Sequence, residues 1–137
     1  FQDFKLLHDR NVFDNVAFAL RVTGTKSSTI KKKVLPLLTE LGLGHRRNHY
    51  PRELSGGEQQ RVAICRALLL GPKLILADEA TGNLDPRNKM LILDALFQAV
   101  ATQQATVLAV THDHELLDRF DRVIDFRDFL AVSPEAA

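Results

Sequence analysis

The sequence predicts an α/β fold in which a helical N-terminal part precedes a parallel sheet. Residues 9–50 carry helical periodicity and no clear strand, whereas short apolar runs alternate with helical segments from Leu54 onward. Strands that alternate with helices are typical of a parallel sheet. The chain has 137 residues, of which 45% are hydrophobic, and this is enough apolar material for a core.

Charge and composition exclude several classes of protein. The 18 Lys and Arg residues nearly balance the 17 Asp and Glu residues, and the two signs are interspersed, which argues against a nucleic-acid-binding arm. No apolar run reaches the roughly 18–20 residues that span a bilayer, so we expect any membrane role to be peripheral. The single cysteine, Cys65, excludes a disulfide within the chain.

The helical part is predicted to contain two helices. Val12, Val16 and Leu20 share one face of the first helix, and the same spacing predicts the core of this part of the chain. A second helix covers residues 30–41, with Ser27 or Ser28 as its N-cap. We expect residues 45–53 to form a connecting loop.

The second part is predicted to alternate helices and strands. Ser55 and Glu58 have the spacing of a capping box, which opens a helix. The run 74–77 is apolar throughout, as expected of a parallel strand that is buried on both faces, and 106–110 is predicted to be a second buried strand. The predicted helices are 55–70, 88–101 and 113–119, and the predicted strands are 74–77, 106–110 and 123–126.

Asp78 and Glu79 directly follow the strand 74–77, where open α/β sheets collect their ligands. One carboxylate there can hold Mg²⁺, and the next can orient or deprotonate a water molecule. His112 follows the strand 106–110 and is expected at the same edge, where it could donate a hydrogen bond to a phosphate. The alternatives are a solvated acidic turn and a surface histidine.

Ser55, Gly56 and Gly57 stand at the start of the predicted helix 55–70. Two glycines there leave backbone N–H groups unshielded at the positive end of the helix dipole, which favours an anion. A plain capping box is the alternative. It explains Ser55 and Glu58 but neither the paired glycines nor Gln59 and Gln60.

Five motifs follow one another along the chain in a fixed order. They are Gln2, 54–61, 74–79, 82–85 and 111–113. This series resembles the glutamine loop, signature motif, Walker B strand, D-loop and switch histidine of ABC-type ATPases. The resemblance implies a partial P-loop NTPase domain with a parallel sheet core plus a helical subdomain, and it implies ATP and Mg²⁺ as cofactors.

The resemblance also implies roles for single residues. Asp78 supports Mg²⁺, Glu79 activates the hydrolytic water, and His112 contacts the γ-phosphate. Gln2 senses the metal and the water, and Asp85 couples two sites across a homodimer. The residues expected to contact the nucleotide of the other subunit are Ser55, Gly56, Gly57 and Gln59.

The resemblance divides the chain into residues 1–53 (Q-loop and helical subdomain), 54–130 (half of the nucleotide-binding core) and a frayed tail, 131–137. No G-x-x-x-x-G-K-[ST] motif precedes these elements, and neither 24–27 nor 71–73 fits that pattern. We therefore expect an N-terminally truncated fragment that neither binds ATP tightly nor hydrolyses it alone. Its full-length parent is expected to be an ATPase.

The short span between Gln2 and Ser55 leaves no room for the insertions of DNA-repair relatives. The sequence around 57–64 and 79–85 resembles a transporter-type subgroup that acts in cell division, lipoprotein release and macrolide export. The cell-division type is favoured. This implies a peripheral protein at the cytoplasmic face of the membrane, bound to an integral membrane subunit that contacts Phe4, Leu6 and Leu7. A tandem-cassette translation factor and a non-catalytic remnant remain alternatives.

Overall fold

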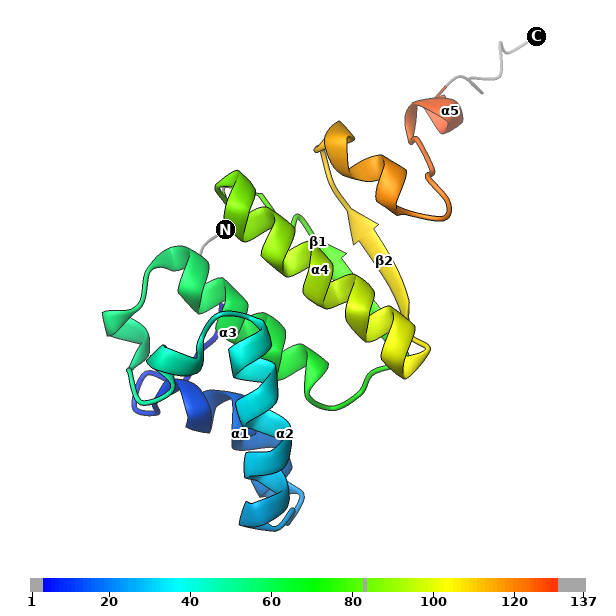
Figure 1. The fold of residues 1–137 in the computed structure, drawn as a ribbon. Coiled ribbons are helices and arrows are strands. Elements are labelled where there is room, and N and C mark those ends of the chain that lie inside the picture. The colour runs from blue at the N-terminus through cyan, green and yellow to red at the C-terminus, as the bar shows by residue number, and fades with distance from the viewer. Residues whose placement is uncertain (1–3, 83, 131–137) are drawn as a thin grey trace, which may run out of the picture.

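The computed structural model describes residues 4–82 and 84–130. Along the chain the helices α1 (Val12–Val22), α2 (Ser27–Glu40) and α3 (Gly56–Leu68) come first (Figure 1). They are followed by β1 (Leu74–Asp78), α4 (Pro86–Gln103), β2 (Thr106–Val110) and α5 (Arg127–Leu130). Short 3-10 helices cover Gly44–Arg46, Pro51–Glu53 and His114–Arg119. The expectations for Gln2 and for the tail 131–137 fall outside the described residues.

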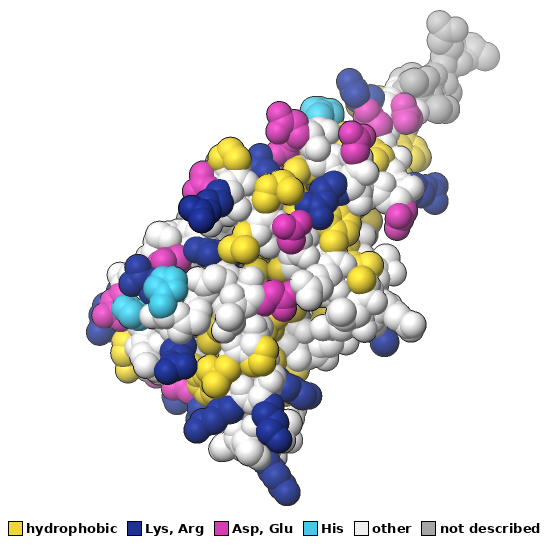
Figure 2. Space-filling view, viewed as in Figure 1, with side chains coloured by type: hydrophobic (Ala, Val, Ile, Leu, Met, Phe, Trp, Pro, Cys, Tyr) yellow, Lys and Arg dark blue, Asp and Glu magenta, His cyan; other side chains and the backbone are white. Residues whose placement is uncertain are grey.

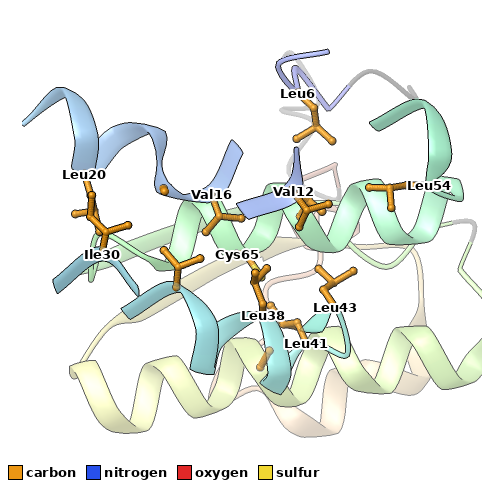
Figure 3. Close-up of a cluster of buried hydrophobic side chains, with 14 residues drawn as sticks. Leu6, Val12, Val16, Leu20, Ile30, Leu38, Leu41, Leu43, Leu54 and Cys65 are labelled. Carbon is orange, nitrogen blue, oxygen red and sulfur yellow. The ribbon is translucent and has the colours of Figure 1, made fainter. Parts of the chain in front are cut away.

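The core of the helical part lies between α1, α2 and α3 (Figure 3). Val12, Val16 and Leu20 are buried there, as their spacing predicts, and they meet side chains of α2 and α3. Leu6 is also buried in this core, with 7% of its surface exposed, and Phe4 packs against it. The expectation that Leu6 is exposed for a partner is therefore wrong.

A buried asparagine fixes the chain that enters α1. Asn15 is 1% exposed, and its Oδ1 accepts a hydrogen bond from the backbone N of Leu7 at 2.7 Å. Its Nδ2 donates to the carbonyls of Leu7, Arg10 and Asn11, each at 3.0 Å. Every hydrogen-bonding group of this amide faces the backbone, so the side chain specifies the path of residues 7–11.

The starts of the helices and the loop after α2 differ in detail from the prediction. Lys26 occupies the N-cap position of α2 and makes no side-chain cap, so neither Ser27 nor Ser28 is the cap. The backbone N of Ile30 donates to the carbonyl of Lys26 at 3.0 Å, which already places Ser27 inside the first turn. The expected loop 45–53 contains parts of two 3-10 helices.

The strands β1 and β2 form a two-stranded parallel sheet. Leu74 pairs with Thr106 at one end of the register, and Asp78 pairs with Val110 at the other. The helix α4 connects the strands, and its Ile92 and Leu96 form a second core with Ile75. This is a βαβ unit, the arrangement that the alternating pattern predicts.

Two expectations about the sheet are wrong. The strands are buried on one face only: Leu76 is 71% exposed and Leu108 is 59% exposed, because no element among the described residues covers that face. Residues 123–126 form no strand, and the side chains of Val123, Ile124 and Phe126 are exposed, because a local pattern of hydrophobic residues cannot supply a partner strand. The Asp125 carboxylate instead accepts the backbone N of Arg127 at 2.9 Å, at the start of α5.

Charges of both signs cover the surface seen in Figure 2, as the composition predicts. Lysine and arginine side chains gather at the end of the molecule formed by α1 and α2, where Lys31, Lys32 and Lys33 are exposed (Figure 2). Among the described residues, no helix combines the length and the hydrophobicity needed to cross a bilayer.

Candidate functional site

Three of the predicted site residues lie at one edge of the sheet. Asp78 is the last residue of β1, and the backbone N of Glu79 donates to the carbonyl of Val110 at 2.8 Å, which continues the parallel pairing. His112 follows two residues after the end of β2. The carboxyl ends of parallel strands meet, and this brings Asp78, Glu79 and His112 together.

Glu79 has an unusual backbone, and one oxygen of its carboxylate accepts no hydrogen bond. Its φ of 51° lies in the left-handed region, which costs a non-glycine residue about 1–2 kcal/mol. Its Oε1 lies 3.4 Å from Nε2 of His112, close enough for an ion pair when the imidazole is protonated. This oxygen is buried and has no hydrogen-bond partner, so it is available to accept a hydrogen bond from a water molecule.

The loop that carries His112 is held by its neighbours. The backbone N of Asp113 donates to Oγ1 of Thr111 at 3.0 Å, and Oδ1 of Asp113 accepts from the backbone N of Glu115 at 3.1 Å. The other oxygen of Asp113 pairs with the ammonium group of Lys89 on α4. This hydrogen bond lowers the pKa of Asp113 and raises the pKa of Lys89. The His112 side chain itself is 96% exposed.

An open hollow of about 330 Å³ lies between α3 and β1, and Asp78 and Glu79 line one side of it. Gln60 and Ala80 line it as well. The side-chain Nε2 of Gln60 donates a hydrogen bond to the carbonyl of Ala80, the residue after Glu79. The helix α3 is thereby attached to the turn that carries the carboxylates.

The N-terminus of α3 has the predicted capping box. Oγ of Ser55 accepts from the backbone N of Glu58 at 3.2 Å, and Oε2 of Glu58 accepts from the backbone N of Ser55 at 3.0 Å. Burial tends to raise the pKa of Glu58, but the Ser55 hydrogen bond and the charge of Arg46 outweigh it and lower this pKa. A Cβ at Gly56 would meet no atom within 4 Å, so the N–H groups of this turn are unshielded on that side.

Gln59 and Asp85 both have structural partners. Nε2 of Gln59 donates to the carbonyls of Pro51 and Leu54, at 3.0 and 3.4 Å. Asp85 caps α4: its Oδ1 accepts from the backbone N of Asn88, and its Oδ2 accepts from Nδ2 of the same residue, both at 2.9 Å. A new ligand of either side chain has to compete with these bonds.

The sequence profile of a known family, described as "ABC transporter", matches residues 1–82, more than half of the chain. The chain belongs to the ABC transporter family. The match covers residues 54–61 and 74–79, the predicted signature motif and Walker B strand, and His112 lies beyond it.

Individual ABC relatives are similar over nearly the whole chain. "Cell division ATP-binding protein FtsE" of Mycobacterium tuberculosis is 48% identical over 91% of the chain and 54% of that protein. The Bacillus subtilis protein of the same name is 44% identical over 99% of the chain and 60% of that protein. "Lipoprotein-releasing system ATP-binding protein LolD 2" of Caulobacter vibrioides is 44% identical over 93% and 56%. The chain thus spans little more than half the length of these relatives.

A solved structure of an ABC protein has the same fold. It is a dimeric, post-hydrolysis state of the ATP-binding cassette MJ0796 bound to ADP and Pi. The TM-score is 0.73 and the sequence identity is 36%, over 85% of this chain and 52% of that one. The observed fold is therefore a partial ABC ATPase domain.

The donor groups of the site fit part of an ABC nucleotide site. The carboxylates of Asp78 and Glu79 suit a hydrated Mg²⁺, because magnesium prefers oxygen ligands and keeps several waters. Oε1 of Glu79 accepts no hydrogen bond and suits a water molecule. Among the described residues, no group of three His, Cys, Asp or Glu side chains forms a metal cluster. A site of this kind depends on the nucleotide phosphates for the remaining ligands.

Sequence reasoning missed two contacts of this site. Gln60 lies in the predicted signature motif but has no role of its own there. A simple capping box does not explain this residue, and this is the signal that the sequence offered. Lys89 was not singled out. It lies 24 residues from Asp113, so nothing in its local pattern indicates the ion pair.

Proposed function

We propose that this chain is part of an FtsE-type ATP-binding subunit that hydrolyses ATP in cell division, together with an integral membrane partner. The 48% identity to the FtsE protein of Mycobacterium tuberculosis supports the type of subunit. The juxtaposition of Asp78, Glu79 and His112 carries the proposed chemistry. Hydrolysis is proposed for the whole protein, because the 137 residues contain no Walker A motif.

Each residue of the site has a proposed task. Asp78 would hold the Mg²⁺ of the nucleotide, and that ion would supply neutralisation of phosphate charge during transfer to water. Glu79 accepts a hydrogen bond from the attacking water and takes its proton, and His112 donates a hydrogen bond to the terminal phosphate. Gln2 is proposed to sense the metal. It lies outside the described residues.

The remaining predicted residues are proposed to act across a homodimer. The backbone N–H groups of the first turn of α3, at Gly56 and Gly57, suit a nucleotide phosphate of the other subunit, with Ser55 and Gln59 beside them. A Cβ at Gly56 would meet no atom within 4 Å, whereas one at Gly57 would contact Leu84 and Asn88. Asp85, at the N-cap of α4, is proposed to couple the two sites. The MJ0796 structure is described as dimeric, which supports this arrangement. The proposed location is peripheral, at the cytoplasmic face of the membrane.

Replacing Glu79 by glutamine in the full-length protein tests the proposal. The change removes the base but keeps the shape, so we expect ATP turnover to fall by about 10²–10⁴ while ATP binding persists. Glu40→Gln, an exposed carboxylate on α2, is the matched control and should turn over normally. Unchanged turnover in Glu79→Gln would exclude Glu79 as the base.

A lipoprotein-releasing type is the second candidate, because the LolD 2 protein is 44% identical. Depletion of the protein in its host separates the two. Filamentous or chained cells with normally sorted lipoproteins support the cell-division type, whereas lipoproteins retained in the inner membrane support the other.

A further inference from the structure

An ion pair joins the first turns of α4 to the loop that carries His112. The ammonium group of Lys89 donates to Oδ2 of Asp113, and the two side chains are only 23% and 22% exposed. The backbone N of Lys89 donates to the carbonyl of Asp85 at 3.0 Å. Lys89 thus lies one helical turn after the D-loop aspartate and reaches the residue next to the switch histidine.

The imidazole of His112 is held by few contacts of its own. Its side chain is 96% exposed, and its Nε2 lies 3.4 Å from Oε1 of Glu79. Its position therefore depends on the backbone of residues 111–113. That backbone is fixed by the end of β2, by the hydrogen bond from Asp113 to Thr111, and by Lys89.

We propose that Lys89 is a positioning residue for ATP hydrolysis, which holds the His112 loop against Glu79 and links that loop to the Asp85 turn. This inference rests on the proposed ATPase function. Lys89 touches neither the carboxylates of the site nor His112 directly, and it acts through Asp113. A displacement of about 1 Å at a catalytic group can cost up to about a hundredfold in rate, so the loss of one anchor has a measurable effect.

A second ion pair between the same two elements provides a matched control. Arg119 of the 3-10 helix His114–Arg119 contacts Asp94 of α4 at 2.9 Å. This pair is more exposed, with side chains 33% and 64% accessible, and it involves the last residue of the 3-10 helix rather than the residue next to His112. Asp94→Asn therefore removes an ion pair between α4 and the 3-10 helix without touching the anchor of the histidine loop.

The experiment compares Lys89→Met, Lys89→Arg and Asp94→Asn in the full-length protein. We expect Lys89→Met to lower kcat by about ten- to a hundredfold, with the KM for ATP within about twofold. Lys89→Arg keeps the cation and should recover most of this loss. Asp94→Asn should match the wild type. Thermal unfolding of each variant is measured alongside, and Lys89→Gln replaces Lys89→Met if the latter does not fold.

The outcomes separate this inference from the proposed function. A wild-type protein without ATPase activity overturns both. An active wild type with unchanged kcat in Lys89→Met and Lys89→Gln overturns the positioning role alone. A loss that Lys89→Arg fails to recover, or that Asp94→Asn reproduces, also overturns it, because the effect then reflects general stability.

Discussion

The side-chain amide of Gln60 donates a hydrogen bond to the backbone carbonyl of Ala80, twenty residues further along the chain. This contact joins the signature helix α3 to the turn that follows Glu79. The contact uses only the backbone carbonyl of residue 80 and not its side chain. The turn is therefore fixed without help from the side chain at position 80.

Replacing Gln60 by alanine should loosen this turn. The change leaves the Ala80 carbonyl without its partner in a partly buried place, so we expect a loss of about 1–2 kcal/mol in the free energy of unfolding. Urea denaturation measures it. Gln98→Ala, on the exposed side of α4, is the control and should lose less than about 0.5 kcal/mol. Equal stability of the two variants would contradict the contact.

Replacing Asn15 by aspartate should be strongly destabilising. The new carboxylate oxygen would face three carbonyl oxygens that now accept hydrogen bonds from Nδ2. A buried charge without a donor costs several kcal/mol, so we expect a loss of at least about 3 kcal/mol. Asn48→Asp makes the same isosteric change at an exposed position and should be nearly neutral. Circular dichroism during urea unfolding distinguishes the two, and similar midpoints would refute the role of Asn15.

Cys65 makes stability depend on alkaline pH. Burial raises the pKa of its thiol to about 12, above the ordinary value of 9.0. Between these values the unfolded thiol loses its proton and the folded one keeps it, so stability falls as pH rises. Relative to Cys65→Ala, the wild type should lose about 1 kcal/mol between pH 9 and pH 10. If the free energy of unfolding changed equally with pH in the two proteins, the raised pKa of Cys65 would be ruled out.

The two faces of β1 should respond differently to truncation. Ile75 is 7% exposed and lies in the core under α4, so Ile75→Ala should cost about 2–4 kcal/mol. The neighbouring side chain of Leu76 is 71% exposed, so Leu76→Ala in the 137-residue chain should cost less than about 1 kcal/mol. Chemical denaturation of both variants checks this, and a large loss for Leu76→Ala would mean that its face is covered.

The helices could be predicted because their apolar residues repeat with the helical period, and the two paired strands because short apolar runs alternate with helical segments. Val12, Val16 and Leu20 must share a face of a helix, and that face must be buried. The run 123–126 has the same composition as a strand but forms none. Pairing depends on a neighbour, which a local pattern does not contain. The exposure of Leu76 was missed for the same reason.

The candidate site, too, could be predicted from the sequence only in part. The meeting of Asp78, Glu79 and His112 follows from parallel strands that end at one edge, so the sequence was sufficient. The contacts of Gln60 and Lys89 join segments 20 and 24 residues apart, and they depend on how α3 and α4 pack. The catalytic tasks of these residues remain predictions, to be decided by the kinetic variants.

The helix α3 holds two other segments at once. Besides the Gln60 contact, the guanidinium of Arg66 donates to the carbonyls of Lys5 and Phe4, at 2.8 and 2.9 Å. The two attachment points are six residues apart, or about 9 Å along the helix axis. An α-helix moves as a stiff rod over such a length, so a tilt of α3 displaces the turn after Glu79 and the segment at Phe4 together. Because both segments are hydrogen-bonded to α3, this helix connects the turn after Glu79 to the start of the described chain.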